Sequence, residues 1–209
     1  MKKIISMLLV LVCAFALFSC QSGNKLTELD EFLAFADAKE PTRITTLVSY
    51  TKGDTTLNAR FVTEADGENA VVDYSYQRMA LVEELADTPI VEKTGKVYLK
   101  DSKYYAGEKW DASAPVVIYP DFNFAEANFD SYTINGTKTQ LVGTASGDKI
   151  AALLGTDVQV DGTATFTLTT NGTYLTGIEV MYTTTSGANV EIRTSYTYSP
   201  VSIEFPDAG

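Results

Sequence analysis

The sequence has no histidine, and it has only two cysteines among its 209 residues. Histidine is the commonest general base, zinc ligand and pH-sensitive group in proteins, so another residue would have to take each of those roles. Cys13 lies within an apolar N-terminal run, which leaves Cys20 as the only thiol beyond it. A single thiol excludes a disulfide framework and a thiolate metal cluster. The sequence therefore predicts no disulfide, no metal site and no cofactor.

Basic residues are also scarce, because 16 lysines and arginines stand against 27 aspartates and glutamates, for a net charge of −11. Two of the lysines, Lys2 and Lys3, belong to the N-terminal leader. Without the leader, 14 basic and 27 acidic residues remain, for a net charge of −13. A surface this acidic repels nucleic acid and anionic lipid headgroups. We therefore expect no nucleic-acid partner, and the acidity favours solubility outside the cytoplasm.

The first twenty residues follow the order of a secretory leader. The two lysines precede an apolar run from Ile4 to Phe18, which at about 15 residues is shorter than the ~20 that span a bilayer. The run ends in Leu-Phe-Ser-Cys, which resembles a bacterial lipoprotein lipobox. We expect cleavage before Cys20, lipidation of that cysteine, and attachment of the protein to a membrane of the cell envelope through an N-terminal diacylglyceryl-cysteine. Residues 1–19 would be the signal peptide, 20–25 the lipidated tether, and 26–209 a single domain.

Two helices are expected in this domain. Over residues 27–38, Thr27 begins a capping-box-like start, and Leu29 and Leu33 share one face at helical spacing. Pro41 ends this segment, because the residue before a proline is driven out of the helical region. A shorter helix is predicted within residues 146–154, with a glycine as its stop. The longer helix should direct Leu29 and Leu33 onto the sheet.

From residue 42 onward, apolar and polar residues alternate in short runs that are separated by turn residues. Threonine occurs 27 times and tyrosine 12 times, and both residue types favour strands. Asn135-Gly136 and Asn171-Gly172 predict hairpins with type I′ turns, in which both central residues have positive φ. Asp101-Ser102 is the expected turn of another hairpin, over residues 95–105. The pattern predicts an antiparallel meander of the α+β class.

Two stretches depart from the alternation. Residues 79–86 are compatible with a helical turn or with the end of a long strand. Residues 110–130 form a long loop, and its end, from Asp121 onward, is rich in oxygen ligands that suit calcium. Glu126, however, stands where a calcium loop of the EF-hand type requires glycine. Phenylalanines at 122, 124 and 129 instead suggest a loop held against the core.

No arrangement of residues in the sequence suggests catalysis. Residues 143–147 resemble a nucleophile elbow only superficially, because Ser146 stands one position late and no histidine is present to activate it. The carboxylates include no pair that stands out for glycoside hydrolysis. We therefore expect a protein that is not an enzyme.

The lipobox cysteine, one amphipathic helix, the hairpin strands and a short late helix together resemble the LolA-like lipoprotein superfamily, including its LppX/LprG group. Residues 95–105, followed by Trp110, are similar to that group's central strand pair. Residues 196–206 are similar to its closing strand and proline-terminated tail. The resemblance implies a strongly curved antiparallel sheet, a half-barrel of about ten to eleven strands whose concave face is covered by a few helices. It also implies carriage of lipids or acyl chains, or a sensor role in the envelope, and no catalytic residues.

Apolar strand faces are compatible with two functions. The sheet and its helices could enclose an open cavity for a lipid or acyl chain, or they could be filled by a closed core. In the second case the protein would be a non-enzymatic interaction or sensor lipoprotein that binds another envelope protein. The residues that would line such a cavity are Leu29, Phe32, Leu33, Val72, Tyr74, Tyr76, Val97, Leu99, Tyr132, Ile134, Ile178, Val180, Ile192 and Tyr196.

Overall fold

The computed structural model describes residues 28–37, 39–77, 92–107, 110–111, 122–155, 158 and 160–207. Cys20, the leader, the tether, residues 79–86 and most of the 110–121 stretch lie outside this part of the chain, so the predictions made for them stay predictions. No helix of the described part is long and apolar enough to cross a membrane.

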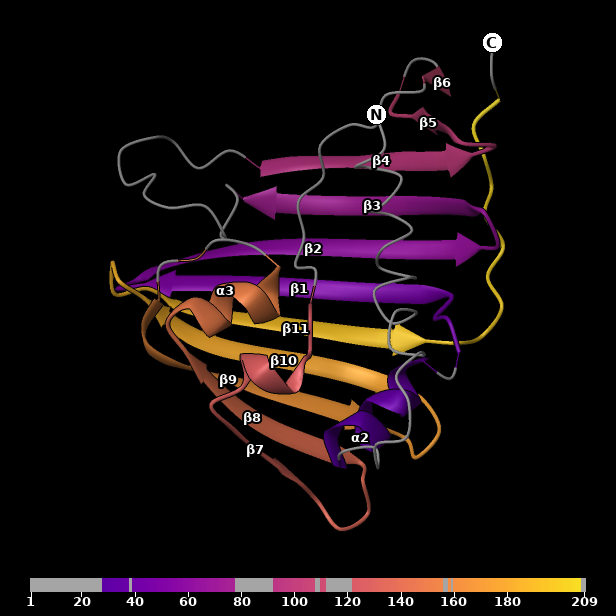
Figure 1. Cartoon of the computed structure of the whole chain (residues 1–209). Helices are drawn as coiled ribbons and strands as arrows, with labels where there is room; N and C mark the ends of the chain where they lie inside the picture. Colours follow the sequence, from indigo (N-terminus) through magenta and orange to yellow (C-terminus); the bar gives the residue numbers. More distant parts are fainter. Residues whose placement is uncertain are drawn as a thin grey trace.

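The chain forms one antiparallel sheet with short helices on one side (Figure 1). The helical segments are α2 (Glu28–Asp37), the 3-10 turn η1 (Glu126–Asn128) and α3 (Asp148–Leu154). The strands of the first half are β1 (Arg43–Lys52), β2 (Thr55–Asp66), β3 (Asn69–Gln77), β4 (Glu92–Lys100), β5 (Lys103–Tyr105) and β6 (Trp110–Asp111). Those of the second half are β7 (Ser131–Ile134), β8 (Gln140–Ser146), β9 (Val160–Thr170), β10 (Leu175–Thr184) and β11 (Asn189–Thr197).

The strand order is β6-β5-β4-β3-β2-β1-β11-β10-β9-β8-β7, so the 11-stranded sheet consists of two meanders. They meet where β1 pairs with β11, in a register that runs from Arg43 opposite Thr197 to Thr51 opposite Asn189. The α+β class and the antiparallel strands are as predicted, but a single meander would have left β1 at an edge. The strong curvature of a half-barrel stays a prediction.

Both predicted helices are present, and each begins and ends close to the predicted bounds. The longer one begins at Glu28 and ends at Asp37. The shorter one is followed by Gly155, which adopts the left-handed conformation with φ of 65°. That conformation is the one in which glycine commonly ends a helix.

The hairpins occur where the turn residues predicted them, but their turn types differ from the prediction. Only Asp101 and Ser102 both have positive φ, at 48° and 60°, as a type I′ turn requires. At Asn135 the loop runs over residues 135–139, and Lys138 rather than Gly136 has positive φ. The Asn135 side chain accepts hydrogen bonds from the backbone N–H groups of Thr139 and Gln140, at 2.8 and 3.1 Å. This local side-chain contact explains the longer loop, and the type I′ prediction was wrong there.

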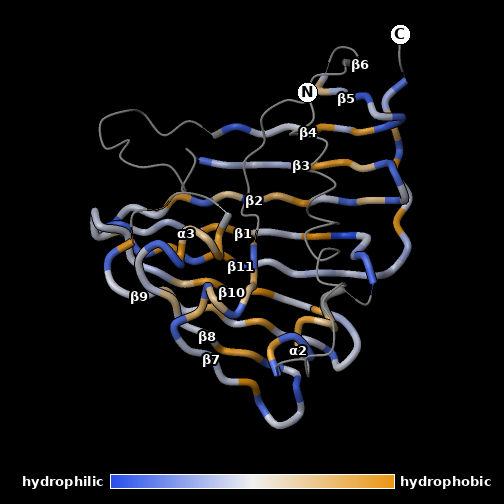
Figure 2. The backbone as a smooth tube through the Cα atoms, viewed as in Figure 1, coloured by the Kyte–Doolittle hydropathy of each residue, from blue (hydrophilic) through white to orange (hydrophobic). Residues whose placement is uncertain are grey.

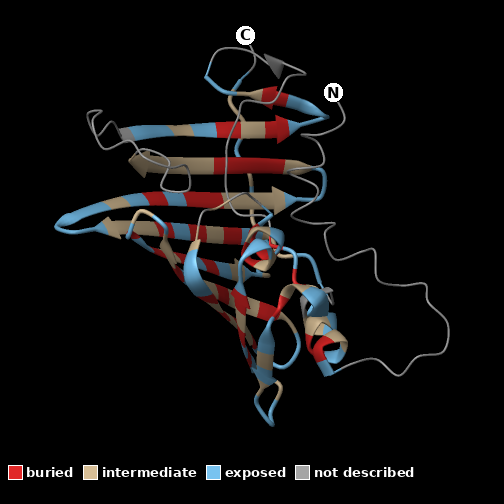
Figure 3. Cartoon of the chain, turned by 60° about the vertical axis from the view of Figure 1, so that its left-hand side comes forward, coloured by how far each residue is buried: buried red, intermediate tan, exposed pale blue. Residues whose placement is uncertain are grey.

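The two faces of the sheet differ in composition. The helix face, on which α2, α3 and η1 lie, carries most of the apolar residues of the strands, and buried positions recur along the strands (Figure 3). Val62 and Val71 are buried on the opposite side. Hydrophobic and polar residues alternate along the chain within the strands (Figure 2). The opposite side, called the far face here, carries mostly threonines and charged residues, with Leu47, Val142 and Met181 as its exposed large apolar side chains in the described part.

The end of the long loop is held against the helix face, as its phenylalanines suggested. Phe122, Phe124 and Phe129 are buried, and the ring of Phe124 stacks at 5.5 and 6.2 Å from the other two. The Asn123 N–H donates to the carbonyl of Leu153 in α3 at 2.8 Å. The loop therefore contributes to the core between α3 and strands β8 and β9.

Candidate functional site

The residues predicted to line a ligand cavity all belong to the helix face. The strand register places apolar residues of this face opposite one another on neighbouring strands. Val72 pairs with Val97, Val180 with Ile192, and Ile192 with Val48. Leu29 and Phe32 of α2 join the same hydrophobic cluster as the strand residues. The sequence pattern thus grouped residues of one surface, although the fourteen residues do not form one continuous lining.

Five of them lie in a closely packed core. Leu29 and Phe32 are each 1% exposed, Ile178 is 3% exposed, and Val180 and Ile192 are completely buried. Around them lie further buried residues of β8, β9 and α3. In this conformation these five side chains contact protein rather than an open space.

The remaining candidates form a second surface and a rim. Val97 and Leu99 of β4 belong to a separate small cluster with Ala70 and Tyr104, against which Tyr74 packs. Val72, on the neighbouring strand, is 1% exposed. The partly buried residues at the rim of the main core are Leu33, Tyr74, Tyr76, Tyr132, Ile134 and Tyr196.

Aromatic side chains connect the two clusters across β2 and β3. The ring centroids of Phe61 and Tyr76 lie 6.4 Å apart, and those of Tyr76 and Tyr74 lie 5.9 Å apart, with both pairs stacked. Tyr74 and Tyr76 are only partly buried. Figure 1 shows α2 and α3 over the other part of the sheet, toward β7–β11 and β1. The aromatic row therefore continues the apolar helix face beyond the described helices.

Several ionisable groups of the described part have shifted pKa values. Burial raises the pKa of Tyr182 and Tyr104, and it raises the pKa of Tyr198 to about 12. Hydrogen bonds from Lys149 and Ser146 lower the pKa of the Asp130 carboxyl. Each of these shifts moves the pKa of its group further from neutral pH. Among the described residues, no three histidine, cysteine, aspartate or glutamate side chains are grouped so that they could hold a metal ion.

Tyr104 has a further feature. Tyr104 is 3% exposed, and its buried hydroxyl has no hydrogen-bond partner among the described residues. A buried hydroxyl without a partner is destabilising. The hydroxyl belongs to the small cluster on β4 and β5, next to the aromatic row.

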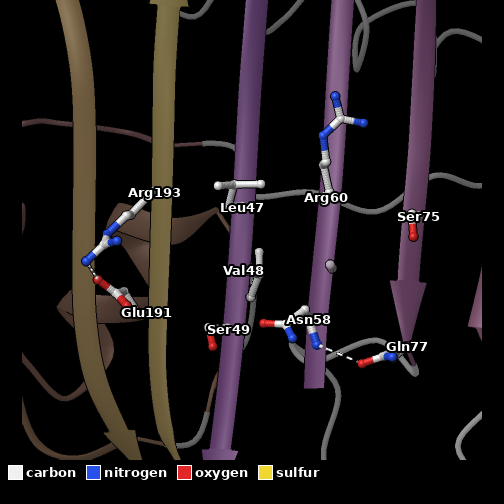
Figure 4. Close-up of a pocket in the computed structure, with 10 residues that line it drawn as sticks. Leu47, Val48, Ser49, Asn58, Arg60, Ser75, Gln77, Glu191 and Arg193 are labelled. Atoms are coloured by element: carbon white, nitrogen blue, oxygen red, sulfur yellow. Dashed lines mark hydrogen bonds and ion pairs between the residues drawn. The ribbon is translucent and has the colours of Figure 1, made fainter. Parts of the chain in front are cut away.

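The far face holds a shallow depression with a volume of about 480 Å³, centred on β1 and β2 (Figure 4). Its floor includes Val48 and Ala59, which belong to the helix face by register and so contribute backbone. The side chains that line it come from four neighbouring strands: Leu47, Ser49, Asn58, Arg60, Ser75, Gln77, Glu191 and Arg193. They are mostly polar, unlike the predicted cavity residues.

This depression was not predicted from the sequence. Leu47 was a visible signal, because it is an apolar residue on the polar side of a strand. Leu47 pairs with Arg60 on one side and with Arg193 on the other. The pairing of Leu47 with Arg193 depends on the contact between β1 and β11, which no local sequence pattern predicted.

Comparisons with known proteins give a likeness of fold only. No family model matches the chain, and no curated protein matches it. A solved structure of a LolA superfamily protein from Nitrosomonas europaea is similar over 85% of this chain and 96% of that chain, with a TM-score of 0.34 and 9% identity. The dehydratase domain from the CurF module of curacin polyketide synthase is similar over 95% of this chain and 83% of that chain, with a TM-score of 0.18 and 8% identity.

The first of these structures belongs to the superfamily that the sequence pattern resembles. At TM-scores below 0.5, neither likeness carries an argument about function.

Proposed function

We propose that this protein is a non-enzymatic lipoprotein of the bacterial cell envelope that binds an apolar ligand, a lipid or acyl chain, on the helix face of its sheet. The observation that best supports this proposal is the aromatic row of Phe61, Tyr76 and Tyr74. It extends the apolar surface from the packed core toward the small cluster of Val97, Leu99 and Tyr104. A ligand lying along this row would cover tyrosines that are now partly exposed.

The binding would be passive. Each methylene group that leaves water contributes about 0.8 kcal/mol, so a long acyl chain gains affinity without any catalytic residue. The sheet would curve as a half-barrel around the ligand, with α2 at one side. The anchor on Cys20 would keep the protein at the membrane from which a lipid would be taken.

Two tyrosine-to-alanine substitutions in the aromatic row test the binding site. Tyr74→Ala and Tyr76→Ala should weaken uptake of a fluorescent fatty acid, because both remove part of the row. Tyr98→Ala is the matched control, since Tyr98 is also a partly buried strand tyrosine but lies on the far face, 6.1 Å from Phe205. Equal uptake by all three variants would contradict the proposed site.

The anchor has a separate test. Cys20→Ser should abolish incorporation of labelled palmitate and should move the protein from the membrane fraction to the soluble fraction. Palmitate labelling that persists in this variant would show that the lipid is attached elsewhere.

The second candidate function is an interaction lipoprotein with a filled core. It is favoured by the six candidate cavity residues that are at most 3% exposed. An organic extract of the purified protein, analysed by mass spectrometry, separates the two functions. Co-purified lipid supports the carrier, and repeated absence of lipid together with no fatty-acid uptake supports the filled-core protein.

A further inference from the structure

The far-face depression contains a cation, Arg60, that forms no ion pair with the described residues. Five basic side chains project from the far face of β1, β2, β4 and β11. Three of them meet a carboxylate, and Lys100 lies over the ring of Phe205. Arg43 lies 3.5 Å from Glu64, Lys96 lies 3.6 Å from Asp73, and Arg193 lies 2.9 Å from Glu179. Arg60 forms no ion pair or hydrogen bond with the described part of the chain, although the whole protein carries a net charge of −11.

The charged cluster across Leu47 from Arg60 consists of Arg193 and the carboxylates of Glu179 and Glu191, and it carries a net charge of −1. Glu191 also lines the depression, but its carboxylate pairs with Arg193, which binds Glu179 as well. Arg60 is exposed and stands directly opposite Leu47 in the register, with Arg193 on the other side of Leu47. The two arginines are thus about 10 Å apart at their backbones. Among the described residues, Arg60 is the one charged side chain of the depression that forms no ion pair.

Neutral polar groups lie beside this charge. The Asn58 N–H donates to Oε1 of Gln77 at 3.4 Å, which orients the Gln77 amide and leaves its NH₂ group as a donor. Ser49 adds a hydroxyl, and Figure 4 shows Ser49 and Asn58 on adjacent strands at the same end of the depression. Hydroxyl and amide groups both donate and accept hydrogen bonds, as the hydroxyl groups of a ligand do.

Leu47 supplies the apolar part of the surface. Its side chain is 45% exposed between the two arginines. A guanidinium group binds a carboxylate or phosphate through two parallel hydrogen bonds, and such charge-assisted bonds are the stronger ones. The depression therefore combines one site for an oxyanion, several for hydroxyl groups, and one apolar contact for carbon–hydrogen groups.

We propose that this depression is a second binding site, in which Arg60 binds the oxyanion of a small hydroxylated molecule such as a sugar acid. Asn58, Gln77 and Ser49 hydrogen-bond its hydroxyl groups, and Leu47 contacts its ring carbons. The site is independent of the proposed lipid site, because it lies on the opposite face of the sheet. Loss of one would leave the other intact.

The test follows the side-chain amide resonances of Asn58 and Gln77 by NMR in the full-length protein. Glucuronate should shift both resonances saturably, and glucose, which lacks the charge, should bind at least about tenfold more weakly. Inorganic phosphate should compete with glucuronate, because both oxyanions need Arg60. Phosphate binding as tightly as glucuronate would contradict the sugar acid as ligand, because phosphate has no ring carbons for Leu47 to contact.

Arg60→Gln should weaken glucuronate binding at least about tenfold. Arg43→Gln is the matched control, since Arg43 is also on the far face but pairs with Glu64, and it should leave binding unchanged. Thermal unfolding of both variants shows whether the fold is kept. The proposal is overturned if neither anion shifts the two amides saturably, if glucose binds as well as glucuronate, or if Arg60→Gln binds like the wild type.

Discussion

Gly143 is a residue whose missing side chain makes room for a neighbour. A Cβ atom at this position would lie 2.5 Å from two carbons of the Phe129 ring. The ring is buried, and it packs at 6.1 Å from Phe166 and at 6.2 Å from Phe124. Phe129 can therefore occupy its place in the core only because position 143 is glycine.

We expect Gly143→Ala to destabilise the protein by about 1–3 kcal/mol, the usual cost of overpacking a core. Gly136→Ala is the control, because nothing lies within 4 Å of a Cβ at Gly136 and its φ is not positive. Urea unfolding measures both free energies. Equal stability of the two variants would show that Phe129 moves aside without cost.

Asp130 links the long loop to α3 through charge. Its carboxylate lies 2.8 Å from the Lys149 Nζ and accepts a hydrogen bond from the Ser146 hydroxyl. The hydrogen bonds from Lys149 and Ser146 lower the pKa of Asp130 below its ordinary value of 3.8. A carboxyl whose pKa is lower in the folded state binds fewer protons there than in the unfolded state. Its stabilising contribution is complete above the unfolded pKa and is lost as the pH falls through the folded pKa.

Asp130→Asn should therefore lower stability most near neutral pH, and the difference from the wild type should shrink as the pH falls below 3.8. Urea unfolding measured from pH 6 down to acid conditions gives this difference. Because the pair is exposed, the effect should be small and should decrease with added salt. A difference that does not change with pH would mean that the asparagine acts through packing rather than charge.

At the scale of elements, α2 shows how an amphipathic pattern is used. The sequence predicted that Leu29 and Leu33 would face the sheet. Leu29 and Phe32 are each 1% exposed, whereas Leu33 is only partly buried at the edge of the core. The helix is therefore rotated so that Phe32, rather than Leu33, lies deepest beside Leu29.

Leu29→Ala should cost about 2–5 kcal/mol, because it leaves a cavity in a filled core. Leu33→Ala should cost less, because Leu33 is already partly exposed. Urea unfolding of the two variants gives the comparison, and a larger loss at Leu33 would contradict the observed orientation. If Leu33→Ala weakens fatty-acid uptake while stability hardly changes, Leu33 contacts the ligand. If it changes neither stability nor uptake, the helix does not cover the sheet as proposed.

At the scale of the whole molecule, the pairing of β1 with β11 joins the two meanders. A buried pair of threonines lies in this contact, since Thr46 and Thr194 are 6% and 5% exposed and stand opposite each other in the register. Their hydroxyl groups are hydrogen-bonded at 3.0 Å. Each hydroxyl is satisfied by a residue 148 positions away in the sequence.

Replacing either threonine with valine should leave the other hydroxyl buried without a partner, at a cost of about 1–3 kcal/mol. The double variant Thr46→Val/Thr194→Val should be more stable than either single variant, because both polar groups are removed together and the shape is kept. Urea unfolding of the four proteins completes the cycle. Simply additive losses would show that the two hydroxyls do not depend on each other.

The sequence by itself determined the local structure of this protein. Alternation placed most of the apolar residues of each strand on one face, and turn residues marked the hairpins, because both signals depend only on neighbours in the chain. The helical spacing of apolar residues predicted both helices, and Gly155 predicted the end of the second one, because these signals also depend on residues close together in the chain. The type I′ turn predicted at Asn135-Gly136 did not form, because the Asn135 side chain accepts hydrogen bonds from two backbone N–H groups in a longer loop.

Only the tertiary structure decided which strands meet and how full the core is. The pairing of β1 with β11 joins segments about 150 residues apart, so no local residue pattern specifies it, and it alone brings Arg193 to Leu47 and Arg60. Alternation likewise shows which side of a strand is apolar, but not whether another side chain already fills the space in front of it. That depends on the placement of α2, α3 and the end of the long loop with its phenylalanines, which bury Val180 and Ile192 completely while Tyr74 and Tyr76 stay partly exposed.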